Sequence, residues 1–170
     1  PGDEAPVENK TPAEARATSR VRLLRRIATA WQDLLAACDG LSDAELLEPG
    51  VAGTWSVKDI IAHVTVWESE ALSHLPIVLA GRRPRRYSVT HGGINAFNAQ
   101  MTQRNRDLPL SEVLQRRDDT HARLIEFVQR VPESECGGGT RFRRRLRLDT
   151  YGHYAIHARA IRAWRVRRRI

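Results

Sequence analysis

Apolar residues recur every three or four positions along four long stretches of the chain, which is the pattern of amphipathic helices. The first stretch covers residues 17–38, and its shared face holds Val21, Leu24, Ala28, Trp31, Leu35 and Cys38. The second begins after Ser56, whose hydroxyl suits a helix start, and is expected to reach about Ala80. Its shared face holds Ile60, His63, Val64, Trp67, Ala71 and Leu75.

Two further helices are expected in the second half of the chain. One begins after Pro109, with Ser111 as its cap, and ends before Pro132. The other covers about residues 149–168 and places His153, Ile156, His157, Ala160, Ile161 and Trp164 on one face. With no convincing strand pattern, the sequence predicts an all-α, four-helix bundle in residues 19–170.

The segments between these helices are less regular. Residues 41–47 can form one or two helical turns, and residues 81–106 form a long connector between the second and third helices, with a helix-like run at 94–101. Residues 141–147 are strongly basic, and their pattern does not indicate a structure. Residues 1–18 are polar and contain acidic residues and prolines, so we expect a flexible leader there.

Length and composition fit one domain that folds through its own core. A chain of 170 residues can bury roughly 70% of its unfolded surface. Cys38 and Cys136 lie far apart and lack zinc-type spacing, which favours a reduced, cytoplasmic protein. No apolar run approaches the roughly 20 residues of a membrane span, so no membrane partner is expected.

The chain is basic, with a formal net charge of +8. Its basic residues are nearly all arginines, and they form blocks at residues 82–86, 141–147 and 165–169. Such blocks can neutralise phosphates, which would give nonspecific, salt-dependent contact with DNA. A solvated surface, with an arginine bias from coding composition, explains the same blocks and is the favoured interpretation.

His153 and His157 are four residues apart, which places both imidazoles on one helix face within reach of a single ion. His63 lies on the inward stripe of another helix and could supply a third nitrogen. Three neutral nitrogens suit zinc, nickel, iron or cobalt and leave positions open for water or substrate. The alternative is a set of hydrogen-bonded core or groove histidines. His74, His91 and His121 have no histidine partner at such a spacing, and a structural or solvent-exposed role is expected for each.

Three motifs resemble a known family. The run from Gly53 to His63, continued to Trp67, resembles the second-helix signature of the DinB-like superfamily, and the run from Tyr151 to His157, with Ile161 and Trp164, resembles its fourth-helix signature. Between them, Asn95, Phe97, Asn98, Gln100, residues 110–114 and the pair Thr120-His121 resemble the ClbS/DfsB branch. The motifs follow in the family order and span nearly everything after the leader.

This resemblance implies a DinB-like four-helix bundle with His63, His153 and His157 as ligands of a divalent metal. It also implies a small bacterial resistance or detoxification protein, a hydrolase or thiol transferase that opens an electrophilic or strained ring by attack of water or a low-molecular-weight thiol. Members of the ClbS/DfsB branch are not uniformly metal-dependent, so the three histidines would otherwise serve as bases in a groove. The alternative function is a non-catalytic bundle that sequesters a small molecule or binds DNA, and a homodimer fits either function.

Several side chains could support such a site. Trp55, Trp67 and Trp164 are candidates for the walls of a substrate pocket, although ordinary core packing is the favoured interpretation for them. Asn95, Phe97 and Asn98 are candidates for substrate contact. Glu68 is expected to pair with an arginine, Asp59 to cap the second helix or orient His63, and Tyr154 to point away from His153.

Overall fold

The computed structural model describes residues 18–170, so the expected leader, apart from Thr18, lies outside the described residues. No described helix is long and apolar enough to cross a membrane. Within the described part, the chain is built of helices joined by short turns. In chain order they are α2 (Ser19–Cys38), α3 (Asp43–Leu47), α4 (Val57–Leu79), α5 (Tyr87–Thr90), α6 (Ile94–Asn105), α7 (Leu110–Arg130), the 3-10 helix η1 (Glu133–Cys136), α8 (Arg141–Asp149) and α9 (Tyr151–Arg168).

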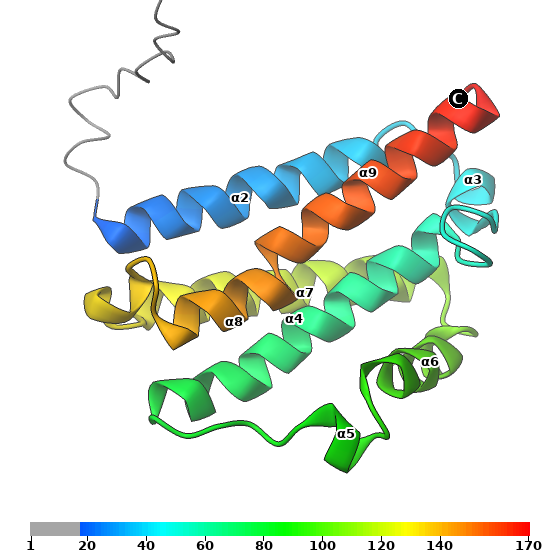
Figure 1. Ribbon diagram of the computed structural model, residues 1–170. Helices are drawn as coiled ribbons and strands as arrows, with labels where there is room; N and C mark the ends of the chain where they lie inside the picture. Colours follow the sequence, from blue (N-terminus) through cyan, green and yellow to red (C-terminus); the bar gives the residue numbers. More distant parts are fainter. Residues whose placement is uncertain (1–17) are drawn as a thin grey trace, which may run out of the picture.

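The helices form the predicted bundle. Its four members are α2, α4, α7 and the consecutive pair α8 and α9 (Figure 1). Helix α9 packs along α2, while α4 packs against α7 and α8. The long connector between the second and third members carries α5 and α6, which lie beside α4 (Figure 1). The predicted all-α, four-helix bundle is therefore confirmed.

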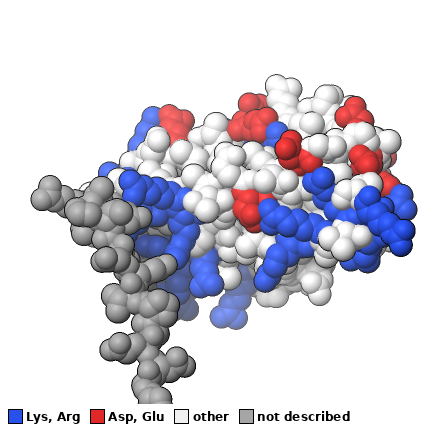
Figure 2. All heavy atoms as spheres, turned by 90° about the horizontal axis from the view of Figure 1, so that it is seen from above, with Lys and Arg blue, Asp and Glu red and all other residues white. Residues whose placement is uncertain are grey.

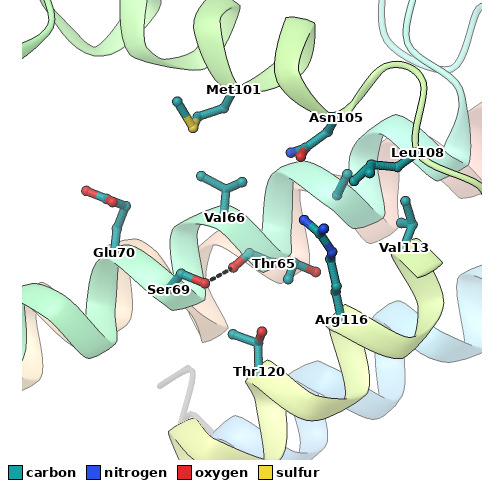
Figure 3. Close-up of a pocket in the computed structure, with 11 residues that line it drawn as sticks. Thr65, Val66, Ser69, Glu70, Met101, Asn105, Leu108, Val113, Arg116 and Thr120 are labelled. Atoms are coloured by element: carbon teal, nitrogen blue, oxygen red, sulfur yellow. Dashed lines mark hydrogen bonds between the residues drawn. The ribbon is translucent and has the colours of Figure 1, made fainter.

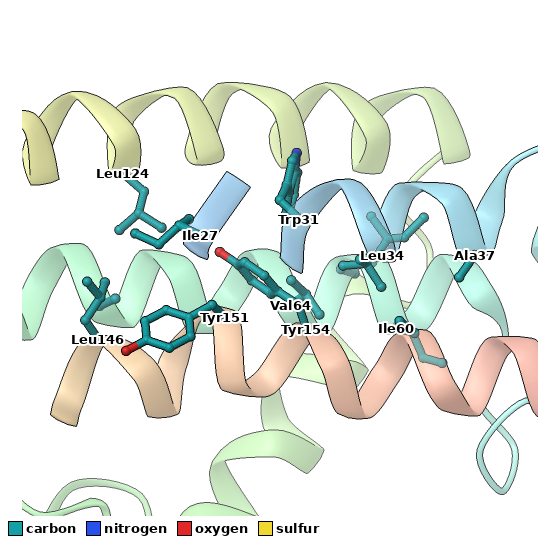
Figure 4. Close-up of a cluster of buried hydrophobic side chains, with 14 of the residues drawn as sticks. Ile27, Trp31, Leu34, Ala37, Ile60, Val64, Leu124, Leu146, Tyr151 and Tyr154 are labelled. Atoms are coloured by element: carbon teal, nitrogen blue, oxygen red, sulfur yellow. The ribbon is translucent and has the colours of Figure 1, made fainter. Parts of the chain in front are cut away.

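One continuous core joins the four members of the bundle (Figure 4). Ile27 and Leu34 of α2, Val64 of α4, Leu124 of α7 and Leu146 of α8 are each at most 2% exposed. Burial of such a side chain contributes about 1.5–3 kcal/mol relative to exposure. A core of this size holds the backbones of the bundle in fixed positions, which is what a site built from several helices requires.

The buried face of α2 differs from the predicted one. The structure buries Leu23, Ile27, Trp31, Leu34 and Ala37, whereas Val21 is 38% exposed. Leu24, Leu35 and Cys38 flank the core and are half-buried. Two neighbouring stripes of this helix have helical spacing, and both include Trp31, so periodicity alone does not decide between them. Packing against α9 buries the stripe that contains Ile27.

One helix start also differs from the prediction, and another agrees with it. Helix α7 begins at Leu110, directly after Pro109, so Ser111 lies inside the first turn and is not the cap. The φ angle of Pro109, −57°, and its extended ψ of 146° bring the chain into the helix without a side-chain cap. Helix α4 begins as predicted, because Ser56 and Asp59 form a reciprocal capping box.

The basic connector of undetermined structure is helix α8. Thr140 caps its start, and Phe142 and Leu146 are fully buried. The arginines between them form hydrogen bonds or an ion pair with neighbouring groups. The fourth member of the bundle is therefore two helices and not the single helix expected from about Asp149. Thr150 breaks it, with φ −130° and ψ −108°, and α9 starts at Tyr151.

A second, smaller core holds the connector against α4. Trp67 of α4 packs with Tyr87 of α5 and Phe97 of α6. Two hydrogen bonds reinforce this contact: Trp67 Nε1 donates to Asn98 Oδ1 at 3.2 Å, and Lys58 Nζ donates to the carbonyl oxygen of Arg106 at 2.9 Å. These contacts fix α6 beside the part of α4 that carries His63.

Candidate functional site

Three histidines from two helices converge at the centre of the candidate site. His63 lies on α4, and His153 and His157 lie one turn apart on α9. His153 Nε2 is 3.0 Å from His63 Nε2 and 2.9 Å from His157 Nε2. One ring nitrogen from each residue lies within 4.8 Å of the other two. The structure therefore brings together all three histidines singled out from the sequence.

Burial keeps these imidazoles uncharged. Desolvation, followed by the proximity of His153 and His157, lowers the pKa of His63 to about 3. Desolvation, followed by the proximity of His157, lowers the pKa of His153 to about 3, and desolvation lowers the pKa of His157 to about 4. All three side chains are neutral near pH 7, the protonation state in which imidazole ligates a metal.

The geometry of the three nitrogens fits a shared cation. A neutral imidazole nitrogen carries either a proton or a lone pair, so His153 Nε2 cannot form ordinary hydrogen bonds to two other Nε2 atoms as both donor and acceptor. A divalent ion between three lone pairs resolves this conflict, and three imidazoles are a donor set that zinc, nickel, iron and cobalt accept. One feature departs from common metal sites: His153 Nδ1 is buried and has no partner among the described residues.

Aromatic side chains enclose the histidines. The Trp55 ring centroid is 4.8 Å from that of His63, and the Trp67 centroid is 6.3 Å from His63 and 6.0 Å from His153. Both tryptophans thus lie next to the histidines, Trp55 at a surface hollow and Trp67, 9% exposed, in the second core. Trp164 is 2% exposed and lies in the main core instead. For this residue the structure agrees with the core-packing interpretation.

The residues predicted for substrate contact lie at different depths. Trp55, Asn95 and Asn98 line a surface hollow of about 450 Å³ beside α6. Asn95 is exposed, whereas the side-chain amide of Asn98 is engaged by Trp67. Phe97 is 2% exposed and packs against Trp67 at 5.6 Å between centroids, so it supports the wall and does not line the hollow.

Glu68 has different partners from the predicted arginine. It is completely buried, and its Oε1 accepts hydrogen bonds from His121 Nδ1 at 2.8 Å and from the Tyr154 hydroxyl. His121 in turn stacks on Trp31, with ring centroids 3.8 Å apart. This network connects α4, α7, α9 and α2. Periodicity did not reveal it, because a buried carboxylate has no spacing signature of its own.

Tyr154 is fully buried in the core and its hydroxyl donates to Glu68, whereas the sequence predicted only that it points away from His153. Burial, followed by the charge of Glu68, raises the pKa of Tyr154 well above its usual value, so the hydroxyl remains a donor. Asp59 Oδ2 accepts from the backbone N–H and the hydroxyl of Ser56, which confirms its capping role. Both residues therefore position helices that carry the histidines.

Sequence reasoning missed residues on α6 that border the histidines. Met101 and Asn105, with Asp59, Ala62 and Thr102, line a small hollow of about 10 Å³ against His63. This volume is close to that of one water-sized probe. Met101 and Asn105 are four residues apart in a helix of weak amphipathic pattern, and nothing in their spacing distinguishes them from other surface positions.

A helical bundle with three converging imidazoles on two of its members belongs to the class of bundles that can hold a metal ion between helices. The chain belongs to the DinB superfamily, whose family model matches residues 26–160. Comparison with curated proteins gives no match.

Two solved structures share the fold. One is described as "Sibling Lethal Factor Precursor - DfsB", with a TM-score of 0.72 and 16% identity over 91% of this chain and 99% of that chain. The other is the colibactin self-resistance protein ClbS in complex with a dsDNA, with a TM-score of 0.68 and 14% identity over 86% of this chain and 94% of that chain. Their names are those of the branch that the sequence motifs resemble, and at these identities the likeness establishes the fold.

Proposed function

We propose that this protein is a small resistance or detoxification enzyme that directs water or a low-molecular-weight thiol onto a small electrophile. The observation that carries the proposal is the convergence of His63, His153 and His157 as three neutral imidazoles in a partly buried site. The fold shared with the self-resistance protein ClbS supports the biological role.

The three histidines would hold a divalent ion, with zinc, nickel, iron and cobalt as candidates. A metal in such a site lowers the pKa of a bound water or thiol toward neutrality and so supplies a nucleophile. Trp55 and Trp67 shield the imidazoles from bulk water, which strengthens electrostatic interactions inside the site. The hydrogen bonds of Glu68 fix α4 against α9 and thereby hold His63 in register with the other two histidines.

Metal content of tag-free protein tests this proposal. We expect close to one divalent ion per chain after loading, and loss of that ion in His63→Ala, His153→Ala and His157→Ala. His91→Ala is the matched control, because His91 bonds Thr90 at the surface and should leave metal content unchanged. Equal metal content in all four variants would contradict the site. Far-UV circular dichroism shows whether each variant keeps its helices.

Turnover separates an enzyme from a sequestering protein. Styrene oxide, a neutral strained-ring probe, would be incubated with loaded protein with and without L-cysteine. The diol or the thioether, detected by mass spectrometry in molar excess over protein, is the expected result and identifies the nucleophile. Loss of the probe in a one-to-one ratio, without product, favours the non-catalytic alternative.

A second candidate function, contact with DNA, is favoured by the surface around α2 and α9. Lys and Arg side chains gather along one part of this face, while most acidic groups lie along another (Figure 2). Arg26, Arg147 and Arg159 line an open hollow of about 910 Å³, and none of the three has an ion pair or side-chain hydrogen bond within the described chain. ClbS is described in complex with dsDNA, and unpaired arginines are suited to contact phosphates.

The salt dependence of duplex binding tests this second function. Replacing Arg26, Arg147 and Arg159 together with Gln should reduce the slope of log affinity against log salt by roughly 0.9 for each lost phosphate contact. The triple variant Arg82→Gln, Arg83→Gln and Arg85→Gln removes the same charge from the connector and should leave a steeper slope. Identical slopes for the two triple variants would show that the hollow is not the DNA surface.

A further inference from the structure

A second pocket lies on the α6 and α7 side of α4, away from the hollow that contains Trp55. It has a volume of about 230 Å³, and its walls come from all three helices (Figure 3). Most of its surface is apolar and is formed by Ala62, Val66, Met101, Leu108 and Val113. A cavity of ~150 Å³ accommodates benzene. This pocket therefore has room for one ring with a substituent.

The polar groups of the pocket indicate an uncharged ligand. Glu70 accepts a hydrogen bond from the Tyr87 hydroxyl at 2.6 Å and lies 3.7 Å from His74 Nε2. Arg116 pairs with Glu112 on its own helix. Arg116 is thus paired with a carboxylate and offers no free counter-ion to an anionic ligand, while Glu70 is already engaged by the Tyr87 hydroxyl.

Two uncharged polar groups remain available. Within the described chain, neither the side-chain amide of Asn105 nor the hydroxyl of Thr120 has a hydrogen bond, although Thr120 is only 8% exposed. Both side chains project toward the pocket, Asn105 from α6 and Thr120 from α7 (Figure 3). An apolar wall with a few free hydrogen-bonding groups is the usual composition of a small-molecule site.

The pocket adjoins the histidine centre. Ala62, Met101 and Asn105 line this pocket and also the small hollow that contains His63. Ala62 precedes His63 on α4, so these three side chains lie at the boundary between the two spaces. Met101 is flexible and can change rotamer at low cost. A molecule held in the pocket therefore lies one side-chain layer from the imidazole of His63.

We propose that this pocket binds a small neutral molecule with one ring and a hydroxyl or carbonyl group, and that it presents the molecule to the histidine centre past Met101. The polar group of the ligand bonds Thr120 or Asn105, and the ring packs on Val66 and Val113. This inference rests on the proposed function only for the role of the histidines. Binding itself is independent of it.

Fluorine NMR of a defined probe tests the pocket. 4-Fluorophenol is neutral at pH 7, like a tyrosine side chain, and its dissociation constant follows from the shift and width of its fluorine signal. Val66→Phe fills the pocket and should weaken binding at least tenfold. Val166→Phe makes the same change at a position on α9 that is 78% exposed, and should bind like the unmodified protein. Equal affinities for the two variants, or no binding by the unmodified protein, would overturn the proposal.

A second variant keeps the test independent of overpacking. Thr120→Val preserves the side-chain shape and removes only the hydroxyl. It should weaken 4-fluorophenol several-fold and leave fluorobenzene, which lacks the hydroxyl, unchanged. Weakening of both probes by the same factor would contradict a hydrogen bond to Thr120. As a test of selectivity against anions, 4-fluorobenzoate should bind at least tenfold more weakly than 4-fluorophenol.

A paramagnetic ion tests the link to the histidines. In protein loaded with Co²⁺, the fluorine nucleus of bound 4-fluorophenol should relax faster than in protein loaded with Zn²⁺. Equal relaxation would show that the pocket does not adjoin the centre. A chain that takes up no Co²⁺ contradicts the proposed function alone, and the comparison of Val66→Phe with Val166→Phe then still decides the pocket.

Discussion

Replacement of Tyr154 by Phe isolates one hydrogen bond of the buried network. The change removes only the hydroxyl, which donates to Glu68 Oε1. Tyr154 and Glu68 are both completely buried, so water cannot take over as a donor. Glu68 keeps its bond from His121 but loses half of its donors, because Oε2 has no partner among the described residues.

The expected loss of stability follows from these contacts. A hydrogen bond to a charged group contributes roughly 1.5–3 kcal/mol, and complete burial places this one toward the upper end. We therefore expect the free energy of unfolding to fall by about 2–3 kcal/mol. At roughly 2–4 °C per kcal/mol for a domain of this size, Tm should fall by about 4–12 °C.

Urea denaturation followed by far-UV circular dichroism measures this loss, with an unchanged m-value as the check that both proteins unfold in the same way. Tyr151→Phe is the matched control. Tyr151 is on the same helix and 7% exposed, but its hydroxyl makes no hydrogen bond within the described chain. The control should lose less than about 0.5 kcal/mol. A loss below that value for Tyr154→Phe, or equal losses for both variants, would refute the reasoning.

Two further predictions concern α8 and α9. Burial, only partly offset by Arg145, raises the pKa of Asp149 from 3.8 to about 6, so the folded state holds a proton between these pH values that the unfolded state has released. Rising pH therefore lowers the free energy of unfolding across this window by up to about 3 kcal/mol. Urea denaturation at several pH values measures this effect. The unmodified protein should lose stability with rising pH relative to Asp149→Asn, which cannot titrate at this position. A Cβ at Gly152 would lie 2.8 Å from the carbonyl oxygen of Arg147, so Gly152→Ala should lower the free energy of unfolding by about 1–3 kcal/mol. Gly138→Ala is the control, because the space around Gly138 is open, and it should be nearly neutral in the same assay.

The sequence predicted the bundle and the histidine cluster because both depend on local spacing. Helical periodicity placed His63 on the inward face of one helix and His153 and His157 on one face of another. Convergence of the two faces then followed from the family resemblance. The break at Thr150 does not separate His153 from His157, because α9 starts two residues before His153 and contains both residues.

The parts that periodicity missed depend on packing between helices. On α2, two adjacent stripes have helical spacing, and only contact with α9 decides that Ile27 is buried and Ala28 exposed. Glu68 was expected to pair with an arginine because it lies five residues after His63 and therefore off the face that carries this histidine, whereas donors from α7 and α9 satisfy it in the core. The pocket beside Thr120 requires three helices to meet, which no single stretch of sequence encodes.

X-ray absorption at the zinc edge tests the central claim most directly, because it reports the atoms around a bound ion. For protein loaded with one Zn²⁺ per chain, the account predicts a first shell with three imidazole nitrogens at about 2.0–2.1 Å. His153→Ala should lose both the imidazole signal and stoichiometric binding. A first shell of oxygen atoms without imidazole, or a chain that binds no Zn²⁺, would contradict the assignment of His63, His153 and His157 as a metal centre.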